Sequence, residues 1–246
     1  MGFVGSKADH SLFTLHKTEP SLFILIYVDD IIITSTSSKE IDLFIKHLGS
    51  TFPVKDLGKL SYFLGVEALY DGHDLYLSQR KYIADLLQRV NMHEAKPCST
   101  PMSTTCTLSK FDGTDFQDQQ LYRSTVGALH YLSFTRPDIA FAVHRVSKFM
   151  QQPKDIHWQA VKRILWYLKS TVGYALHFHN NLDHSFQGFS DADWAADKDD
   201  RCSVGAYCIF HGSNLISWSC KQQPTVARSS TESEYKSLSN TAAEIS

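Results

Sequence analysis

The stretch SLFILIYVDDIIITS, residues 21–35, decides the fold of the first part of the chain. Two runs of aliphatic and aromatic residues flank the adjacent carboxylates Asp29 and Asp30. Such runs are typical of β-strands, and charged residues between two strands are typical of a turn. The stretch therefore predicts a β-hairpin with both carboxylates at its tip.

Two adjacent carboxylates on a rigid tip can hold divalent metal ions. Phosphoryl transfer to a nucleic-acid 3′-hydroxyl uses two such ions. A solvated turn is the simpler interpretation of an Asp-Asp pair taken by itself, because Asp is common in turns. The rest of the sequence has to separate these two interpretations.

The residues after the hairpin predict a helix, a second hairpin and another helix. Ser37 and Glu40 have the spacing of a capping box, and Gly49 is expected to end the helix that they begin. Strands are predicted over residues 62–70 and 74–77, joined through Asp71 and Gly72, and Ser78 is expected to cap the next helix.

The remaining sequence changes character twice. Residues 98–118 are rich in Ser, Thr, Pro and Asp and are expected to form a linker. Helices are predicted over residues 119–133, 137–150 and 155–169, and the last has a core-facing stripe of Trp158, Val161, Leu165 and Leu168. Strands are then predicted over residues 186–192, 205–211 and 214–219, followed by a helix from Ser230 or Thr231.

Charge is unevenly distributed along the 246 residues. The formal net charge is −2, yet residues 121–170 contain eight Lys or Arg and two Asp, a net +6. A basic helical block beside acidic segments suits a protein that handles a polyanion. A solvated helix face is the alternative interpretation. The five widely spaced cysteines form no C-x-x-C pair, which argues against a zinc ribbon or a disulfide scaffold.

Eleven sequence blocks, in order, resemble the Pol polyprotein of copia-type LTR retrotransposons. They are KADHSLF (7–13), YVDDIIIT (27–34), KDLG (55–58), YFLGVE (62–67), LSQRKY (77–82), KPCSTPM (96–102), YRSTVGALHYL (122–132), TRPDIAFAV (135–143), RILWYLKST (163–171), SDADWA (190–195) and SSTESEY (229–235). Stand-alone plant relics of this Pol segment are similar in extent.

The resemblance implies an α+β chain with four parts. These are a portion of the reverse-transcriptase palm (residues 1–97), a linker (98–118), a basic helical thumb or connection segment (119–172) and the first part of an RNase H-like α/β domain (173–246). Retrotransposon reverse transcriptases are RNA-directed DNA polymerases. The implied ligands are Mg²⁺, with Mn²⁺ as a substitute, an RNA template, a DNA primer, RNA/DNA hybrid and dNTPs, and the implied protein partner is the remainder of the polyprotein.

At matching positions the resemblance implies roles for individual residues of the polymerase part. Asp29 and Asp30 would bind metal and carry catalysis. Nucleic acid would lie against Tyr27 and Val28 at the loop and against the primer-grip-like hairpin of Phe63, Leu64 and Gly65. The basic helices would hold the duplex, and their assigned contacts are Arg145, Lys148, Lys162 and Arg163.

RNase H uses a carboxylate from its first strand and one from its first helix to hold metal. Asp191 matches the first, and Glu234 matches the second, with Glu232 left open as the alternative. Residues i and i+2 of a helix point apart, so one of these two glutamates can reach the strand. Asp193 shares a strand face with Asp191 and is expected to assist. Ser229 and Ser230 are interpreted as helix caps rather than nucleophiles.

A complete enzyme of this family needs more than these residues. It takes another metal-binding aspartate from an upstream strand, and its RNase H domain continues with further aspartates. We therefore expect this chain by itself neither to extend primers nor to cleave hybrids. A catalytically inactive truncated relic that at most binds RNA/DNA duplex is the alternative function, and a host-adopted interaction protein has no positive support.

Two further expectations concern metals and location. His177, His179 and His184 are metal-ligating residue types, but without a cysteine or other partner at ligand spacing they are not assigned a metal. The sequence shows no signal-peptide pattern, and its longest apolar run is too short to cross a membrane. We expect a soluble, intracellular protein without membrane contact, cytoplasmic or nuclear, with the mitochondrion as an alternative.

Overall fold

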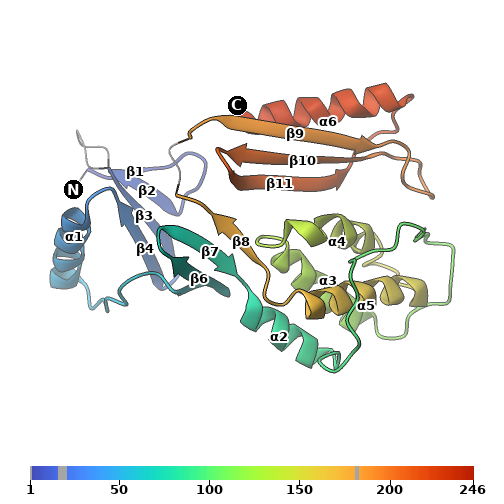
Figure 1. The fold of residues 1–246 in the computed structure, drawn as a ribbon, viewed down its shortest axis with the longest axis horizontal. Helices are drawn as coiled ribbons and strands as arrows, with labels where there is room; N and C mark the ends of the chain where they lie inside the picture. Colours follow the sequence, from blue (N-terminus) through green and yellow to red (C-terminus); the bar gives the residue numbers. More distant parts are fainter. Residues whose placement is uncertain (1, 16–20, 181–182) are drawn as a thin grey trace. The chain divides into compact units, whose positions relative to one another are not determined.

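The computed structural model describes residues 2–15, 21–180 and 183–246 (Figure 1). Helices and antiparallel strands are mixed, in agreement with the predicted α+β class, and the described residues form three antiparallel sheets. Contacts divide the chain into two compact units, Met1–Leu60 and Ser61–Ser246. The division falls inside the segment expected as one palm portion. None of the described helices is both long enough and apolar enough to cross a bilayer.

The first unit is a four-stranded antiparallel sheet followed by a helix. The strands, in spatial as well as chain order, are β1 (Val4–Gly5), β2 (Leu12–Leu15), β3 (Leu22–Tyr27) and β4 (Asp30–Ser35), and the helix is α1 (Ser38–Thr51). β3 and β4 confirm the hairpin predicted from residues 21–35.

The predicted ends of α1 were wrong in detail. Ser37 is the N-cap, but its side chain accepts no backbone N–H, so the capping box with Glu40 is not formed. Instead the Ser37 carbonyl oxygen accepts the N–H of Glu40, at 3.2 Å. Gly49 does not end the helix, because it keeps a negative φ and the helix continues to Thr51.

The second unit begins with a four-stranded sheet. Three of its strands are consecutive in the sequence, and the fourth comes from a distant segment of the chain. The strands are β5 (Tyr62–Phe63), β6 (Val66–Asp71), β7 (Asp74–Ser78) and β8 (Ala175–Phe178), in that spatial order. The single strand predicted over 62–70 is broken by a turn at Leu64 and Gly65, both with positive φ. β8 was not predicted, because its hydrogen-bonding partner β7 lies about a hundred residues earlier and gives no local signal.

Four α-helices of the second unit enclose its main hydrophobic core. They are α2 (Arg80–Arg89), α3 (Gln119–Leu132), α4 (Ala140–Ser147) and α5 (Asp155–Ser170), with the 3₁₀ helix η1 (Pro137–Ile139) before α4. The predicted stripe on α5 is confirmed, with Val161, Leu165 and Leu168 fully buried and Trp158 packed against this core. The helix predicted over 137–150 is shorter. The N-cap position of α2 is Gln79 rather than Ser78, but the Ser78 hydroxyl accepts the N–H of Arg80, the first residue of α2, at 3.2 Å.

Residues 98–118 contain no helix or strand beyond one isolated bridge, from Asp115 to Lys154. They are nevertheless anchored to the helices. Leu108 is buried in the helical core, and the Phe116 ring stacks on Trp158 with centroids 5.1 Å apart. This segment therefore packs against the helices and is not a free linker.

The chain ends in a three-stranded sheet with one helix along it (Figure 1). The strands are β9 (Phe186–Asp193), β10 (Val204–His211) and β11 (Asn214–Gln222), ordered β11-β10-β9, and the helix is α6 (Ser230–Ile245). Small side chains let α6 approach closely, because Ser233, Ser237 and Thr241 are its buried residues. A Cβ at Gly188 of β9 would lie 2.7 Å from Ile245 Cδ1 and 3.1 Å from Thr241 Cγ2, so these two side chains of α6 lie directly over the glycine.

Candidate functional site

The first candidate site is the turn between β3 and β4. Tyr27 pairs with Asp30, so the turn consists of Val28 and Asp29. Val28 has φ 52°. Positive φ is strained for a β-branched residue, and such strain persists where surrounding structure holds it. Here the paired strands on both sides hold the turn, which fixes where the two carboxylates leave the backbone.

The side chains of this turn are open to solvent. Val28 is 82% exposed, and Tyr27, Asp29 and Asp30 are exposed as well. Adjacent carboxylates offer the hard oxygen donors that Mg²⁺ prefers, so the residues fit a magnesium-binding role. Among the described residues, these two aspartates do not belong to a cluster of three or more potential ligands. Further ligands would have to come from a substrate or another segment.

The predicted primer-grip residues form a second tight turn. Phe63 pairs with Val66, which leaves Leu64 (φ 47°) and Gly65 (φ 79°) as its two residues. A Cβ on Gly65 would lie 3.3 Å from the Tyr131 hydroxyl of α3. The turn is thus seated against α3, and the Leu64 side chain is exposed at its tip.

The residues predicted for the RNase H centre lie on β9 and on α6, which packs along it (Figure 1). Asp191 and Asp193 are exposed on β9, and Glu234 is exposed on α6. The Ser237 hydroxyl donates to the Asp191 carbonyl oxygen at 2.7 Å. Ser237 is three residues, or about one turn, beyond Glu234. The fold therefore brings the backbone of Asp191 beside the helical turn that carries Glu234.

The structure treats Glu232 and Glu234 differently. Glu232 forms an ion pair with Lys236 at 2.8 Å, and it accepts the backbone N–H of Arg228, also at 2.8 Å. These two contacts lower the pKa of Glu232, the first more than the second. Ser229 is the N-cap and accepts the N–H of Glu232, as expected of a cap. No hydrogen bond or ion pair of the Glu234 side chain occurs within the described part of the chain.

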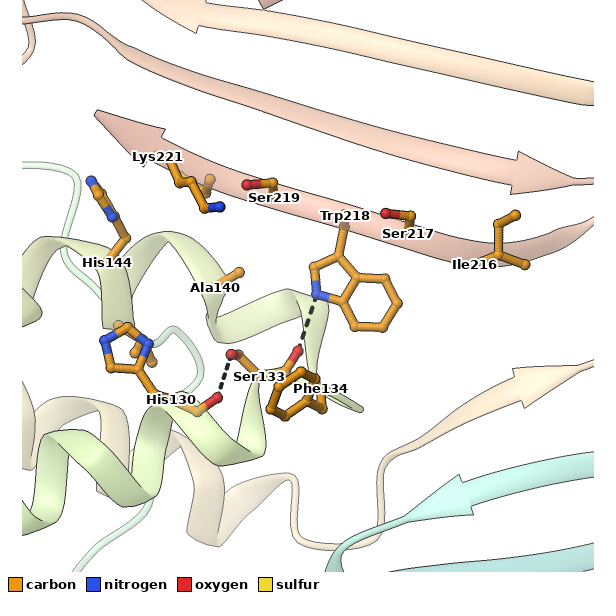
Figure 2. A pocket seen from close by; sticks show the side chains of 12 residues that line it. His130, Ser133, Phe134, Ala140, His144, Ile216, Ser217, Trp218, Ser219 and Lys221 are labelled. Carbon is orange, nitrogen blue, oxygen red and sulfur yellow. Dashed lines mark hydrogen bonds between the residues drawn. The ribbon is translucent and has the colours of Figure 1, made fainter. Parts of the chain in front are cut away.

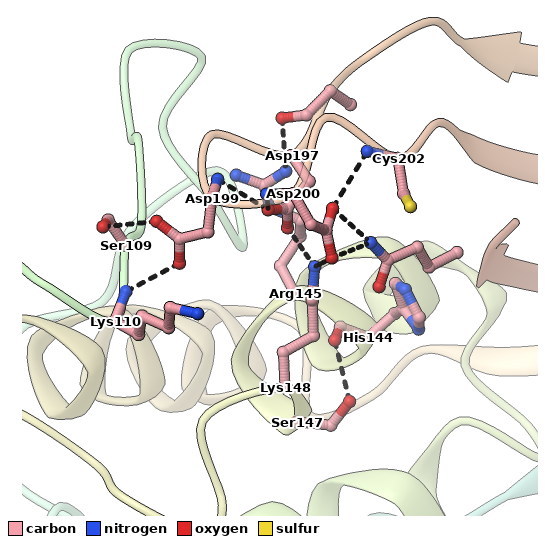
Figure 3. A network of polar contacts seen from close by, with 12 residues as sticks. Ser109, Lys110, His144, Arg145, Ser147, Lys148, Asp197, Asp199, Asp200 and Cys202 are labelled. Carbon is pink, nitrogen blue, oxygen red and sulfur yellow. Dashed lines mark hydrogen bonds and ion pairs between the residues drawn. The ribbon is translucent and has the colours of Figure 1, made fainter. Parts of the chain in front are cut away.

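The four basic residues assigned to nucleic acid have different surroundings. Arg145 is buried and donates to the Ala196 carbonyl oxygen at 3.1 Å, and Lys148 forms an ion pair with Asp197 (Figure 3). Lys162 and Arg163 lie half-buried on α5, where the Arg163 guanidinium donates to Thr100 Oγ1 at 2.7 Å. As nucleic-acid contacts, all four stay predictions. In this fold, Arg145 and Lys148 bind the loop between β9 and β10.

Asp197 is the centre of a polar network that joins this loop to α4 (Figure 3). Its carboxylate accepts the backbone N–H groups of Asp199 and Asp200 at 2.8 and 3.1 Å. Burial by itself would raise the pKa of Asp197. The Lys148 ammonium and the two N–H donors outweigh burial and lower it. Asp199 extends the network by accepting from the Ser109 hydroxyl at 2.6 Å.

A cavity of about 410 Å³ separates β11 from α3 and α4 (Figure 2). Trp218 Nε1–H donates across it to the Ser133 carbonyl oxygen at 3.1 Å. His144 lines the cavity, and its Nε2 is buried without a hydrogen-bond partner in the described structure. Burial, followed by the positive charges of neighbours that include Lys148, lowers the pKa of His144 to about 4.

The lowered pKa of His144 predicts that acid destabilises the second unit. The unfolded state binds a proton on His144 near pH 6.5, whereas the folded state does so near pH 4. Acidification through this window therefore favours unfolding, and we expect His144 to remove about 2 kcal/mol of stability between about pH 7 and about pH 5. Urea unfolding at both pH values measures it. His144→Gln should reduce the loss, and an unchanged loss would contradict this role.

One group of metal-ligating residues was not predicted from the sequence. Asp74, His177 and His179 are the one set of at least three His, Cys, Asp or Glu in the described residues with mutually close ligand atoms. His177 and His179 had been noted together with His184, but Asp74 had not. The missing signal is the pairing of β7 with β8, which joins residues 103 positions apart.

Comparisons with known proteins give a consistent result. A family model described as reverse transcriptase (RNA-dependent DNA polymerase) matches residues 1–104. The chain is 47% identical over 245 residues to the retrovirus-related Pol polyprotein from transposon RE1 of Arabidopsis thaliana. It is 39% identical over 233 residues to the Pol polyprotein from transposon TNT 1-94 of Nicotiana tabacum. These matches cover 100% and 91% of the chain.

The matched relatives differ in length. The chain spans 17% of the RE1 polyprotein and 18% of the TNT 1-94 polyprotein. An uncharacterized mitochondrial protein of Arabidopsis thaliana is 43% identical over 224 residues, which cover 91% of this chain and 93% of that protein. No solved structure matches.

Proposed function

Because this chain belongs to the family of copia-type retrotransposon Pol polyproteins, we propose that it carries two catalytic centres of such a protein. One is the catalytic hairpin of the RNA-directed DNA polymerase, and the other is the first carboxylate pair of an RNase H. The observation that carries the proposal is the strained, solvent-exposed turn with Asp29 and Asp30 side by side.

The proposal assigns parts of the fold to parts of the enzyme. Residues 1–97 are a portion of the palm, 98–118 connect it, 119–172 form a thumb-like or connection segment, and 173–246 belong to an RNase H-like domain. The order of strands and helix in the last part, β9-β10-β11-α6, supports the assignment. So does the approach of α6 to β9 through small residues.

At the polymerase centre, Asp29 and Asp30 are the residues that would hold Mg²⁺, with Mn²⁺ as a substitute. The bound ions supply positive charge that stabilises the attacking and leaving oxygens of phosphoryl transfer. The strand pairing on both sides fixes the two carboxylates, so little reorganisation is needed when a primer end arrives. Tyr27 and Val28 lie exposed beside them and offer a surface for the primer terminus. The turn of Leu64 and Gly65 is the proposed primer grip.

At the RNase H centre, Asp191 and Glu234 are the proposed ligands. Glu234 is preferred over Glu232 because the Glu232 carboxylate is already held by Lys236 and by the Arg228 N–H. Moving Glu232 to a metal would break these contacts at the start of α6. Asp193, exposed two positions after Asp191, is the proposed assisting residue.

A matched pair of substitutions tests this choice. In a full-length Pol protein that contains this segment, Glu234→Gln is expected to reduce cleavage of the RNA strand of a hybrid by about 100-fold or more, because an anionic metal ligand becomes neutral. Glu232→Gln should leave cleavage within about threefold and instead slightly lower the melting temperature, because the ion pair with Lys236 at the start of α6 is lost. Gel-based hybrid cleavage and thermal melting measure the two effects. The reverse pattern would transfer the role to Glu232.

The nucleic-acid duplex is proposed to follow the basic helices. Lys162 and Arg163 on α5 are the better placed contacts, since neither is held by a carboxylate in the described residues. Arg145 and Lys148 could reach phosphate after release from Ala196 and Asp197, so their proposed contribution is conditional on movement of that loop.

One observation favours the second candidate function, an inactive relic that at most binds RNA/DNA duplex. The mitochondrial relative of similar length is 93% covered by this chain. Primer extension and hybrid cleavage by the 246-residue chain separate the two functions. Magnesium-dependent activity of the chain would exclude the relic, and duplex binding without activity would support it.

A further inference from the structure

Three potential metal ligands meet at the start of β7. His177 Nε2 lies 2.8 Å from Asp74 Oδ2, and His179 Nδ1 lies 3.2 Å from the same oxygen. The three ligand atoms are all within 4.8 Å of one another. The two imidazole rings are close, with centroids 3.7 Å apart and planes inclined by 53°. The side chains therefore converge on one point rather than lie in a row.

Neighbouring groups hold each of the three ligands in place. The Tyr76 ring stacks on His177 at 4.1 Å and 10°. The backbone N–H of Asn180 donates to the second carboxylate oxygen of Asp74 at 3.2 Å. The Asn214 side chain makes two hydrogen bonds with the backbone of His179. It accepts the His179 N–H at 2.7 Å and donates to the His179 carbonyl oxygen at 3.0 Å.

We propose that Asp74, His177 and His179 bind one divalent transition-metal ion of the zinc class. Imidazole nitrogen and carboxylate oxygen are typical zinc ligands, and three protein ligands leave a fourth position open. The side chains of Asp74 and His177 are each 30% exposed and that of His179 is 48% exposed, so water can fill this position. Two imidazoles disfavour Mg²⁺, which requires oxygen ligands. The site is therefore chemically distinct from the proposed magnesium centres.

The bound ion would stabilise the pairing of β7 with β8. Asp74 begins β7, and His177 lies on β8, 103 positions later in the sequence. β8 is a four-residue strand at the edge of its sheet, and short strands contribute little stability by themselves. An ion bound to both strands stabilises their pairing by binding linkage. It would thereby join the chain that leaves α5 to the β6–β7 hairpin.

Zinc titration of the purified 246-residue chain tests the proposal. Calorimetry should show one equivalent of Zn²⁺ bound, with a rise in melting temperature that a chelator reverses, and Mg²⁺ should not compete. Asp74→Asn, His177→Gln and His179→Gln should each weaken zinc binding by about 100-fold or more. The controls are His73→Gln, beside Asp74 in sequence, and His184→Gln, from the original histidine pattern. Both should bind zinc as the unchanged protein does.

A second measurement on the unchanged protein removes dependence on the folding of the variants. Zn²⁺ should protect His177 and His179, but not His73, from acylation by diethylpyrocarbonate, as mapped by mass spectrometry. Absence of stoichiometric binding would overturn the proposal. So would zinc affinity that survives all three ligand substitutions, or protection that falls on other histidines. In each of these cases the three residues form a hydrogen-bonded network without a metal.

Discussion

In a full-length Pol protein that contains this segment, Asp29→Asn is expected to lower primer extension by about 10³-fold or more. The substitution keeps the shape of the side chain but removes the negative charge that a divalent ion requires. The turn itself should survive, because its backbone is fixed by the pairing of Tyr27 with Asp30. The Asp29 side chain also makes no hydrogen bond within the described structure. The measurement is the steady-state rate of magnesium-dependent extension.

The control for this effect is Asp42→Asn in the same structural unit. Asp42 is an exposed aspartate on α1, so the substitution makes the same chemical change away from the turn. Extension by this variant should equal that of the unchanged protein. If Asp29→Asn retains more than about a tenth of the extension rate, the turn is a solvated surface feature and not a metal-binding centre.

The second large effect is expected at Arg136, whose side chain is 1% exposed. Its guanidinium donates to both carboxylate oxygens of Asp138, at 2.8 and 2.6 Å, and to the carbonyl and hydroxyl oxygens of Thr171, at 3.1 and 2.6 Å. Tyr167 donates its hydroxyl to the same carboxylate at 2.7 Å. This arginine therefore ties η1 to the end of α5, with two hydrogen bonds to Asp138 and two to Thr171.

Arg136→Ala should lower the free energy of unfolding by about 3–5 kcal/mol. It leaves the Asp138 carboxylate without its cation and removes buried packing as well. Arg136→Lys keeps the charge but not the paired donors, so an intermediate loss is expected. Arg89→Ala, at an exposed position on α2, should change stability by less than about 0.5 kcal/mol. Urea denaturation measures all three, and a loss below about 1 kcal/mol in Arg136→Ala would contradict the interpretation.

The parts of the structure that the sequence predicts are those specified by local pattern. The hairpin of residues 21–35 follows from two apolar runs around charged residues, and the stripe on α5 follows from helical spacing. Both signals lie within a short window. The same is true of Ser229, whose cap was recognised from its place before a helix.

The parts that were missed depend on contacts between distant segments. β8 exists because β7 is there to pair with it, and the ligand set of Asp74 with His177 and His179 follows from that pairing. At the turn between β5 and β6, Gly65 is a local turn signal, whereas positive φ at Leu64 is not predictable because leucine rarely adopts it. The strand prediction over residues 62–70 did not use the glycine and therefore missed the break, although the resemblance implied a hairpin there.

The candidate sites show the same limit. Sequence spacing could not decide whether Glu232 or Glu234 is the metal ligand. The proposed preference for Glu234 is based on the contacts of Glu232 with Lys236 and Arg228. A count of Lys and Arg identified a basic helical block. It could not show that Lys148 faces the buried carboxylate of Asp197 rather than solvent.

The most direct test of the proposed function measures two activities on the same protein preparations. Magnesium-dependent primer extension and hybrid cleavage are assayed for a full-length Pol protein containing this segment, and for its Asp29→Asn and Asp191→Asn variants. We predict that Asp29→Asn loses extension and keeps cleavage, whereas Asp191→Asn loses cleavage and keeps extension. Two variants that keep both activities, or that lose both together, would contradict the assignment of two separate catalytic centres to this chain.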